Sequence, residues 1–444
     1  MNFLKRLLIR TLTDYVMFLV LLLLCVFFSA VTFTEQVDSG PAAAAQLHDI
    51  MNQQFDAGAR VLIAASNQSN DPAFADELER QLREAGFAVL GTIKGGPKEA
   101  RQALEQIQAK NERLDAIACS QVASSWLVFS DLAANFSAIG KPLVVKPASY
   151  RFPNFLKTDN LLNIANQIAV IAIVAIGMTM IIITGGIDLS VGSLIALSAV
   201  VCSVLIRDFA GGKDAAAAGM TLCCMAAILV CGGVGGFSGL MITRFAIPPF
   251  IVTLAMMLVG SGLAYILADG QSIAEIPDSF VWLGRGADLF GVPNAVLLML
   301  LLYAIAHIAM SRMKIGRHTY AVGGNCEAAR LSGVPVSRVI MIAYITSGLL
   351  AGLGGVITAS QLKSGSPTYG NMYELYMIAA VVVGGTSLSG GEGRMLGTLV
   401  GAFTIAVIQN GMNLTNVESY TQKVVLGLVI LGAVLLDRLR HRAK

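Results

Sequence analysis

The sequence predicts a polytopic α-helical membrane protein, with an α/β domain inserted after its first membrane-spanning helix. Of the 444 residues, 55% are hydrophobic and 13% are charged, whereas a soluble globular protein carries roughly 25% charged residues. Apolar runs of about 20 residues, long enough to cross a bilayer as helices, recur along most of the chain. One long polar segment, residues 34–150, interrupts these runs and alternates between strand-like and helix-like patterns.

The N-terminal segment is predicted to be an uncleaved membrane anchor. MNFLKRLLIR is basic, and an unbroken apolar run follows from Tyr15 to Phe33. This run is longer than the core of a signal peptide and lacks a clean A-x-A cleavage site. Residues 1–33 are therefore expected to form a cytoplasmic flank and the first membrane helix.

Ten membrane spans are predicted in all. The 45 glycines fit this class, because small residues let transmembrane helices approach closely. Gly348 and Gly352, like Gly397 and Gly401, have the G-x-x-x-G spacing of such contacts. The predicted spans lie near 15–33, 161–184, 190–206, 215–242, 247–268, 292–311, 337–360, 373–386, 395–414 and 421–436.

Loop charges give these spans an orientation in the inner (plasma) membrane. An even number of spans with a basic, cytoplasmic N-terminus places both termini in the cytoplasm and residues 34–150 outside it. The loop at 311–338 then lies inside and carries five Lys or Arg residues against one acid. The loop at 269–291 lies outside, with four acids against one Arg. This asymmetry agrees with the positive-inside rule.

Residues 34–150 are predicted to fold as a parallel-sheet, Rossmann-like domain. The segment has ten Lys and Arg against fourteen Asp and Glu, a net charge of 10 − 14 = −4. Strands alternating with helices of about 10–15 residues indicate βαβ units. Residues 41–58 are expected to be a short helix or linker. Strands are predicted over 59–66, 87–95, 114–120 and 142–149, and helices over 72–86, 97–112 and 124–138.

Three blocks of the apolar region resemble the membrane (permease) subunits of ABC importers for ribose, xylose, arabinose and related sugars. They are GMTMIIITGGIDLSVGSLIALS (177–198), YAVGGNCEAARLSGV (320–334), and AAVVVGGTSLSGGEGRMLGTLVGAFTIAVIQNGMNL (379–414) with SYTQKVVLGLVILGAVLLDR (419–438). The resemblance covers the first span and about 151–444. It implies a permease domain over 151–444 that translocates a pentose- or hexose-like sugar without chemical change.

The same resemblance implies the partners. These would be ABC ATPase subunits, a second copy of this chain or a homologous permease, and a periplasmic sugar-binding protein as a further candidate. Nucleic acid is not expected, because the net charge is only +3. ATP and Mg²⁺ would be bound by the ATPase, and this chain would hold no cofactor.

EAARLSG, in the cytoplasmic loop at 311–338, resembles the motif by which such permeases contact their ATPase. Carried over, it points to Glu327, Ala328, Ala329 and Gly333. A short surface helix with small residues can seat in a groove, and a glycine lets the chain turn away from it. The alternative is an ordinary helix in a cytoplasmic loop.

LSGGE (388–392) is similar to the signature loop of ABC ATPases, but its context argues against ATP binding. No G-x-x-x-x-G-K-[ST] loop occurs in the chain, and such a loop is needed to hold the phosphates. LSGGE lies between two predicted spans and is interpreted as their connection. The chain is therefore not expected to be an enzyme.

Polar residues in the spans are candidates for the translocation path. Gln409, Asn410 and Asn413 carry amides, which both donate and accept and so suit sugar hydroxyls; interhelical hydrogen bonding is the alternative. Glu374 is a further candidate, although Tyr376 stands where related permeases usually carry an acid.

Asp188 follows two glycines that break the helix. It is interpreted as a cap for the next helix, near the cytoplasmic side, with a place on the path or in a dimer contact as the alternative.

The inserted segment resembles the N-terminal lobe of a periplasmic sugar-binding protein, on the sequence VLIAASNQSNDPAFADELERQLREAGF (61–87). The resemblance points to Asn70, Asp71 and Phe74 as sugar contacts, with Ala73 where a second aromatic often stands. The second lobe is absent. The insert is either a relic or docking platform that holds a separate binding protein, or a tethered half-receptor completed by a partner's lobe. We favour docking or a structural role over direct binding.

Two other classes of protein remain as alternatives. A secondary transporter would need no ATPase and should carry acids inside the membrane. A membrane receptor would use residues 34–150 as its sensor. The seven cysteines lie mostly in apolar runs without C-x-x-C spacing, so they are predicted to be buried free thiols rather than metal ligands or disulfides.

Overall fold

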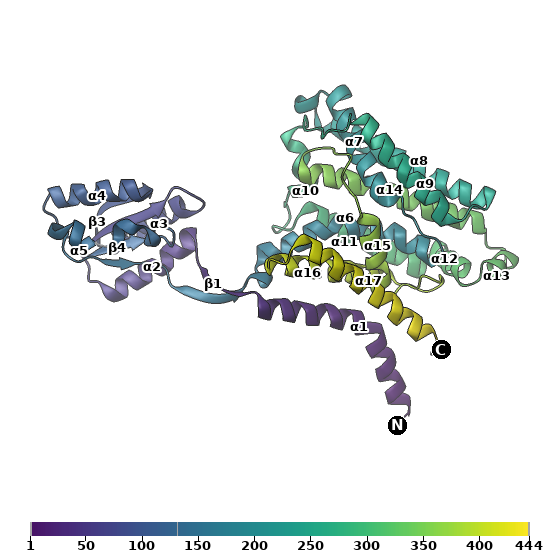
Figure 1. The fold of residues 1–444 in the computed structure, drawn as a ribbon, viewed down its shortest axis with the longest axis horizontal. Helices are drawn as coiled ribbons and strands as arrows, with labels where there is room; N and C mark the ends of the chain where they lie inside the picture. Colours follow the sequence, from purple (N-terminus) through teal and green to yellow (C-terminus); the bar gives the residue numbers. More distant parts are fainter. Residues whose placement is uncertain (1, 131, 443–444) are drawn as a thin grey trace. The chain divides into compact units, whose positions relative to one another are not determined.

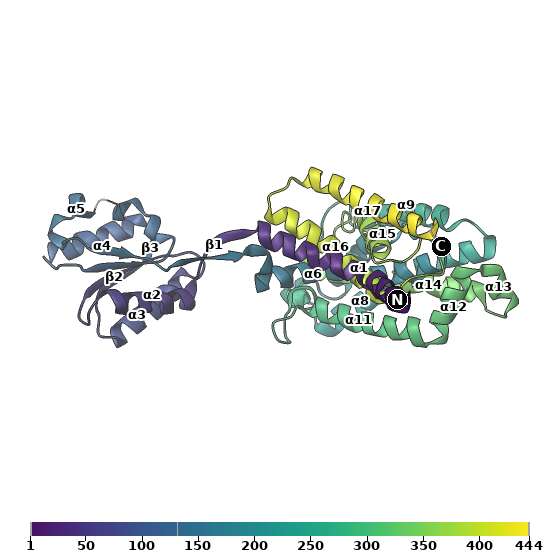
Figure 2. The same ribbon diagram turned by 90° about the horizontal axis from the view of Figure 1, so that it is seen from below.

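The computed structural model describes residues 2–130 and 132–442, and the chain divides into two compact units (Figures 1 and 2). The helical unit comprises Met1–Thr32 and Asn154–Lys444, and the α/β unit comprises Phe33–Pro153. The α/β unit is therefore slightly longer than the predicted domain, 34–150. Each unit has its own hydrophobic core.

The α/β unit is built on four parallel strands in the order β3-β2-β4-β5. They are β2 (Arg60–Ser66), β3 (Ala88–Gly95), β4 (Ala116–Cys119) and β5 (Leu143–Val145). Helices α2 (Gly40–Gln54) and α3 (Asp71–Glu84) cover one face of the sheet, and α4 (Pro97–Ala109) covers the other (Figure 2). Proline in the first turn of all three helices presets the backbone angle that a helix needs.

Alternating side chains of β2 build the two cores. Val61 and Ile63 pack with Phe74 and other residues of α2 and α3. Leu62 packs with Leu104 and other residues of α4 on the opposite face. Because successive strand residues point to opposite faces, a strand covered on both sides is apolar throughout.

The predicted helix over 124–138 is wrong. The chain there forms short 3₁₀ turns at Ala123–Ser125, Leu127–Phe129 and Ser137–Ile139, with a four-residue helix, α5 (Leu132–Asn135). Serine hydroxyls explain part of the difference: Ser124 Oγ donates to the Gln121 carbonyl (2.8 Å) and Ser125 Oγ to the Val122 carbonyl (2.7 Å). Such local bonds compete with a continuous helix.

An antiparallel pair of strands closes the α/β unit. β1 (Phe33–Val37) pairs with β6 (Ser149–Pro153), with Phe33 opposite Pro153 and Val37 opposite Ser149. Strand β1 has no counterpart among the predicted strands, and the strand predicted over 142–149 is shorter, because β5 ends at Val145. The first and last residues of the unit are therefore direct neighbours.

The helical unit contains seven helices that are long and apolar enough to cross a membrane, counted over the described residues. The three other predicted spans fall on shorter apolar stretches, Met17–Val31, Tyr373–Val383 and Ser419–Leu435, so ten spans remain a prediction. The seven helices are α6 (Thr158–Ile183), α7 (Val191–Phe209), α8 (Ala217–Phe245), α9 (Pro249–Leu267), α11 (Asn294–Arg312), α14 (Val336–Leu362) and α16 (Met395–Leu414).

The remaining helices are short or terminal. They are α1 (Asn2–Val31), α10 (Trp282–Arg285), α12 (Lys314–Gly324), α13 (Cys326–Leu331), α15 (Tyr373–Val383) and α17 (Ser419–Arg442). Helix α6 is central: 89% of its most apolar window is buried, against 28% for α8 and α9. The close packing predicted for the G-x-x-x-G pair in α14 is confirmed, because a Cβ at Gly352 would lie 2.8 Å from the Ile228 Cα of α8.

Residues 184–190, between α6 and α7, turn back along α6 instead of lying beyond its end. Ser347 of α14 shows this, because its Oγ donates to Asp188 Oδ2 (3.0 Å) and its Cα would lie 2.6 Å from a Cβ on Gly177. Gly177 is six residues before the last residue of α6, about 9 Å along the helix axis. We call residues 184–190 the returning segment.

A second irregular segment, residues 363–372, runs along α7 between α14 and α15. Gly365 lies against Ala199 and Ser203, and Gly370 lies against Gly192 in the first turn of α7. Irregular backbone at membrane depth is tolerated where protein surrounds it. Both irregular segments therefore end near the start of α7.

The cysteines depart in part from the prediction of buried thiols. Four of the seven are buried, Cys25 and Cys224 are half-buried, and Cys326 is exposed at the first position of α13.

Candidate functional site

Helix α13 is a short, exposed helix with defined ends, and it contains the predicted residues Glu327, Ala328 and Ala329. Asn325 caps its start, because the side chain accepts a hydrogen bond from the Ala328 N–H (2.9 Å). At its end the N–H of Val334 donates to the Ala329 carbonyl and the N–H of Gly333 to the Arg330 carbonyl, both 3.0 Å. This pair of bonds is the Schellman arrangement, which stops a helix and turns the chain away.

Gly333 is required by that arrangement. Its φ is +82°, and a Cβ built on it would meet no atom within 4 Å. The backbone conformation therefore restricts which residue can stand at this position, whereas the space around it does not. Residues with a side chain rarely adopt this left-handed conformation, so glycine is the expected residue there.

One face of α13 packs against neighbouring helices, and the other face is exposed. Ala329 is buried and packs with Val322 of α12 and Val339 of α14. Ala328 is exposed, and Leu331 is 87% exposed. Glu327 and Arg330 form an ion pair (2.8 Å) in which both side chains are 69% exposed. An exposed leucine beside small and charged side chains can seat against another protein.

Asp188 is buried inside the helical bundle, and its place near the cytoplasmic side stays a prediction. Its side chain is 1% exposed. Oδ1 accepts from the backbone N–H (2.9 Å) and the hydroxyl (2.6 Å) of Ser190, and Oδ2 accepts from Ser347. The bond to Ser190 N–H, one residue before α7 begins, resembles a helix cap. The bond to Ser347 adds a contact with α14, so the carboxylate joins two helices.

Glu374 lies near the start of α7. It is half-buried at the second position of α15, and its carboxylate contacts Gly192 so closely that a Cβ would not fit there. Tyr376 is also half-buried and packs edge-on to Tyr373, with ring centroids 6.3 Å apart. Both acids proposed for the path therefore lie next to the first turn of α7. Asp188 precedes this turn in the chain, and Glu374 contacts it from α15.

The three amides of α16 differ in their surroundings. Asn410 is paired with Asn160 of α6, each side chain donating to the other (2.8 and 3.1 Å). This is the interhelical alternative that the sequence left open. Asn413 accepts from Gln422 of α17 (2.8 Å). Gln409 is half-buried, and among the described residues it has no hydrogen-bond partner.

Sequence reasoning missed a row of amides on α6. Asn160, Asn163 and Gln167 are spaced by three and four residues, so they share one face of the helix. Asn163 and Gln167 are exposed and have no hydrogen-bond partner within residues 2–130 and 132–442. The signal was present as TDNLLNIANQIA (158–169), because amides are uncommon in a span unless they face water or a partner.

The predicted sugar contacts of the α/β unit separate into two groups. Phe74 is 1% exposed and packs in the core between the sheet and α3, so the prediction that it stacks on a sugar is wrong in this structure. Asp71 Oδ2 accepts from Ser120 Oγ (2.6 Å) and Ser66 N–H (3.2 Å), which joins the ends of β2 and β4. Asn70 is exposed next to it.

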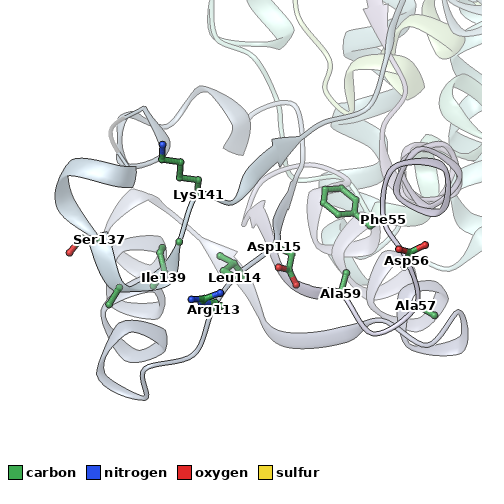
Figure 3. A pocket seen from close by; sticks show the side chains of 12 residues that line it. Phe55, Asp56, Ala57, Ala59, Arg113, Leu114, Asp115, Ser137, Ile139 and Lys141 are labelled. Carbon is green, nitrogen blue, oxygen red and sulfur yellow. The ribbon is translucent and has the colours of Figure 1, made fainter.

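A concavity of about 600 Å³ lies at the opposite end of the same sheet (Figure 3). It is lined by residues that precede β2, β4 and β5, among them Asp56, Arg113 and Lys141. Asp115 also lines it and accepts from the Arg60 N–H (2.7 Å). Ligands of open α/β sheets bind at the carboxyl ends of the strands, where Asn70 and Asp71 lie. The concavity is therefore not the predicted sugar site.

Within the part of the chain that the structure describes, no group of three or more His, Cys, Asp or Glu side chains could hold a metal ion.

Comparison with known proteins identifies the helical unit. A family model described as "Branched-chain amino acid transport system / permease component" matches residues 160–434. The chain is 42% identical over 305 residues to the ribose import permease protein RbsC of Escherichia coli (strain K12), covering 68% of this chain and 92% of that protein.

Two further relatives have similar coverage. The chain is 44% identical over 302 residues to the ribose import permease protein RbsC of Bacillus subtilis (strain 168), covering 68% of this chain and 91% of that protein. It is 38% identical over 292 residues to the L-arabinose transport system permease protein AraH of E. coli, covering 66% of this chain and 86% of that protein. No solved structure matches the chain.

Proposed function

Because this chain belongs to the family of branched-chain amino acid transport system / permease components, we propose that it is the membrane subunit of an ABC importer that carries a pentose or hexose across the inner membrane. The likeness to ribose and arabinose permeases over most of their length is the observation that carries the proposal. Both termini are cytoplasmic and the α/β unit is extracytoplasmic. The charge asymmetry of the loops at 269–291 and 311–338 supports this orientation.

Helix α13 is the contact for the ABC ATPase. The burial of Ala329 and the exposure of Leu331 and Ala328 support this role. One face of the helix packs on α12 and α14, and the other face is accessible to another protein. ATP and Mg²⁺ are bound by the ATPase, and this chain performs no hydrolysis. The assembly contains two permease subunits, either two copies of this chain or this chain with a homologue.

The path for the sugar runs along α6 and α16. Amides that have no partner within the described part of the chain, those of Asn163, Gln167 and Gln409, are its most suitable contacts, because each can both donate to and accept from a sugar hydroxyl. Asn413 is exposed and contributes from the end of α16. Asn410 serves the path indirectly, by holding α16 to α6. Glu374, half-buried beside the start of α7, is the acidic contact of the path. Asp188 serves the path indirectly, by joining the returning segment to α14.

The α/β unit docks a separate sugar-binding protein. The burial of Phe74 favours docking over direct binding, since one lobe without an exposed aromatic has little to hold a sugar. Titration calorimetry of the detergent-solubilised chain with ribose distinguishes the two roles. Heat that is lost in an Asn70→Ala, Asp71→Ala variant would identify a tethered half-receptor instead.

The central experiment is reconstitution in proteoliposomes with the ABC ATPase that co-purifies with the chain. ATP-dependent uptake of radiolabelled ribose is expected. Glu327→Arg and Gly333→Trp should each abolish co-purification of the ATPase, whereas Glu418→Arg, an exposed acid remote in sequence from α13, should leave it unchanged. Uptake that proceeds without ATP hydrolysis would instead identify a secondary transporter.

A further inference from the structure

The end of α12, directly before α13, touches the end of α6. Gly323 lies so close to the carbonyl of Ile183 that no Cβ fits between them. The same carbonyl accepts a hydrogen bond from the N–H of Gly391 (2.9 Å), in the connection between α15 and α16. Tyr320 Oη donates to the carbonyl of Gly393 in that connection (2.8 Å). We call the contact of Ile183, Gly323 and Gly391 the glycine joint.

On the other side of α13, helix α14 touches the returning segment, residues 184–190. Ser347 Oγ donates to Asp188 Oδ2 (3.0 Å), and Tyr344 Oη lies 3.4 Å from the carbonyl of Ile187. Space is tight there as well, because a Cβ on Gly186 would lie 2.8 Å from Tyr344 Oη. The returning segment is therefore fixed at its beginning by the glycine joint and near its end by α14.

Helix α13 is the link between these two contacts. It joins α12 to α14 through a capped start and a Schellman end, and Ala329 packs on both flanking helices. A displacement of α13 is thus expected to move α12 and α14 together, because close-packed elements transmit strain instead of absorbing it. Helix α12 contacts Ile183, the residue directly before the returning segment, and α14 contacts the segment itself. The returning segment leads into α7, where Gly192 contacts Glu374.

We propose that the returning segment receives the movement of α13 through the glycine joint and the Asp188–Ser347 contact, and passes it to the start of α7 beside Glu374. Gly323, Tyr320 and Ser347 are then positioning residues for transport. They contact neither the ATPase nor the sugar, and they set how tightly ATP hydrolysis is linked to uptake. This inference rests on the proposed function as an ABC importer.

Two neighbouring glycines at the end of α12 provide a matched test. Gly323→Ala adds a methyl group inside the glycine joint, whereas Gly324→Ala adds the same group where no atom lies within 4 Å. The readout is the ratio of radiolabelled ribose taken up to ATP hydrolysed, by the chain reconstituted with its co-purifying ABC ATPase. We expect the ratio to fall about tenfold for Gly323→Ala and to stay within about twofold of wild type for Gly324→Ala. An unchanged ratio for an assembled Gly323→Ala complex overturns the inference.

Two further variants decide the matter if Gly323→Ala does not assemble. Tyr320→Phe and Ser347→Ala each remove one hydroxyl and add no atoms, so the fold should persist. Each is expected to lower the ratio about threefold while ATP hydrolysis continues. If both variants keep the wild-type ratio of uptake to ATP hydrolysis, the inference is refuted while the proposed function stands. Wild-type protein that binds no ATPase, or takes up no ribose on ATP addition, would overturn the proposed function and the inference with it.

Discussion

Helix α13 and the returning segment both carry an acid, Glu327 and Asp188, but in opposite environments. Glu327 is 69% exposed and pairs with Arg330 on its own helix, so water competes for every bond it makes. Asp188 is 1% exposed and accepts three hydrogen bonds, one of them from another helix. The exposed acid is therefore available to a partner protein, while the buried acid holds elements of the subunit together.

The largest effect is expected at the buried acid. Asp188→Ala removes the acceptor for three buried donors, and we expect it to destabilise the helical unit by about 3 kcal/mol. Thermal unfolding in detergent, followed by circular dichroism, measures the loss. Asp214→Ala, at an exposed acid, is the control and should unfold at the wild-type temperature. Equal melting of the two variants would show that Asp188 contributes nothing to stability.

A smaller effect is expected at the end of α13. Gly333→Val forces a β-branched residue to a φ of +82°, which costs about 1–2 kcal/mol. Gly333→Asn is the matched control, because asparagine tolerates the left-handed conformation. Co-purification of the ATPase should be lost with valine and kept with asparagine. Loss with both variants would mean that the ATPase contacts the glycine itself rather than the turn it forms.

Removing the charge of the exposed acid should have less effect still. Glu327→Gln breaks a solvent-exposed ion pair, and we expect the stability to change by less than about 0.5 kcal/mol. The melting temperature in detergent should stay close to that of wild type, even if ATPase binding weakens. A loss as large as that of Asp188→Ala would erase the difference between the two acids.

The same contrast of exposed and buried positions can be tested without a mutation. Cys326, at the start of α13, is exposed, whereas Cys119 at the end of β4 is buried, and burial raises the pKa of its thiol to about 12. Because the thiolate is the reactive form, iodoacetamide at pH 8 should label Cys326 and leave Cys119 unmodified. Peptide mass spectrometry of the native and the denatured chain measures both sites. Labelling of native Cys119 at a comparable rate would contradict its burial.

Sequence patterns were informative where local chemistry decides the structure. The strand at 60–66 and the helices after Pro72 and Pro97 follow from alternation and helix-start residues. The short helix over EAARLSG likewise carries its own stop signal in Gly333. Family likeness added the function, through blocks that lie within the matched residues 160–434 except for the last four residues of 419–438.

Sequence patterns were uninformative where contacts between segments distant in the chain decide the surroundings of a residue. The burial of Asp188 depends on residues 184–190 turning back to meet Ser347, which a count of spans does not reveal. Phe74 in the first turn of a helix fits a sugar site and a core equally well until its neighbours are known. Asn410 is a pathway amide by composition, but Asn160, 250 positions away, satisfies it. Each miss concerns a tertiary contact rather than a local preference.

The pairing of β1 with β6 has a consequence for removing the α/β unit. Thr32 and Asn154, the residues on either side of that unit, are themselves joined by a backbone hydrogen bond from the Asn154 N–H to the Thr32 carbonyl (2.9 Å). A short loop can therefore connect them without moving α1 or α6. Excision of residues 33–153 is expected to leave a continuous helical unit that still folds.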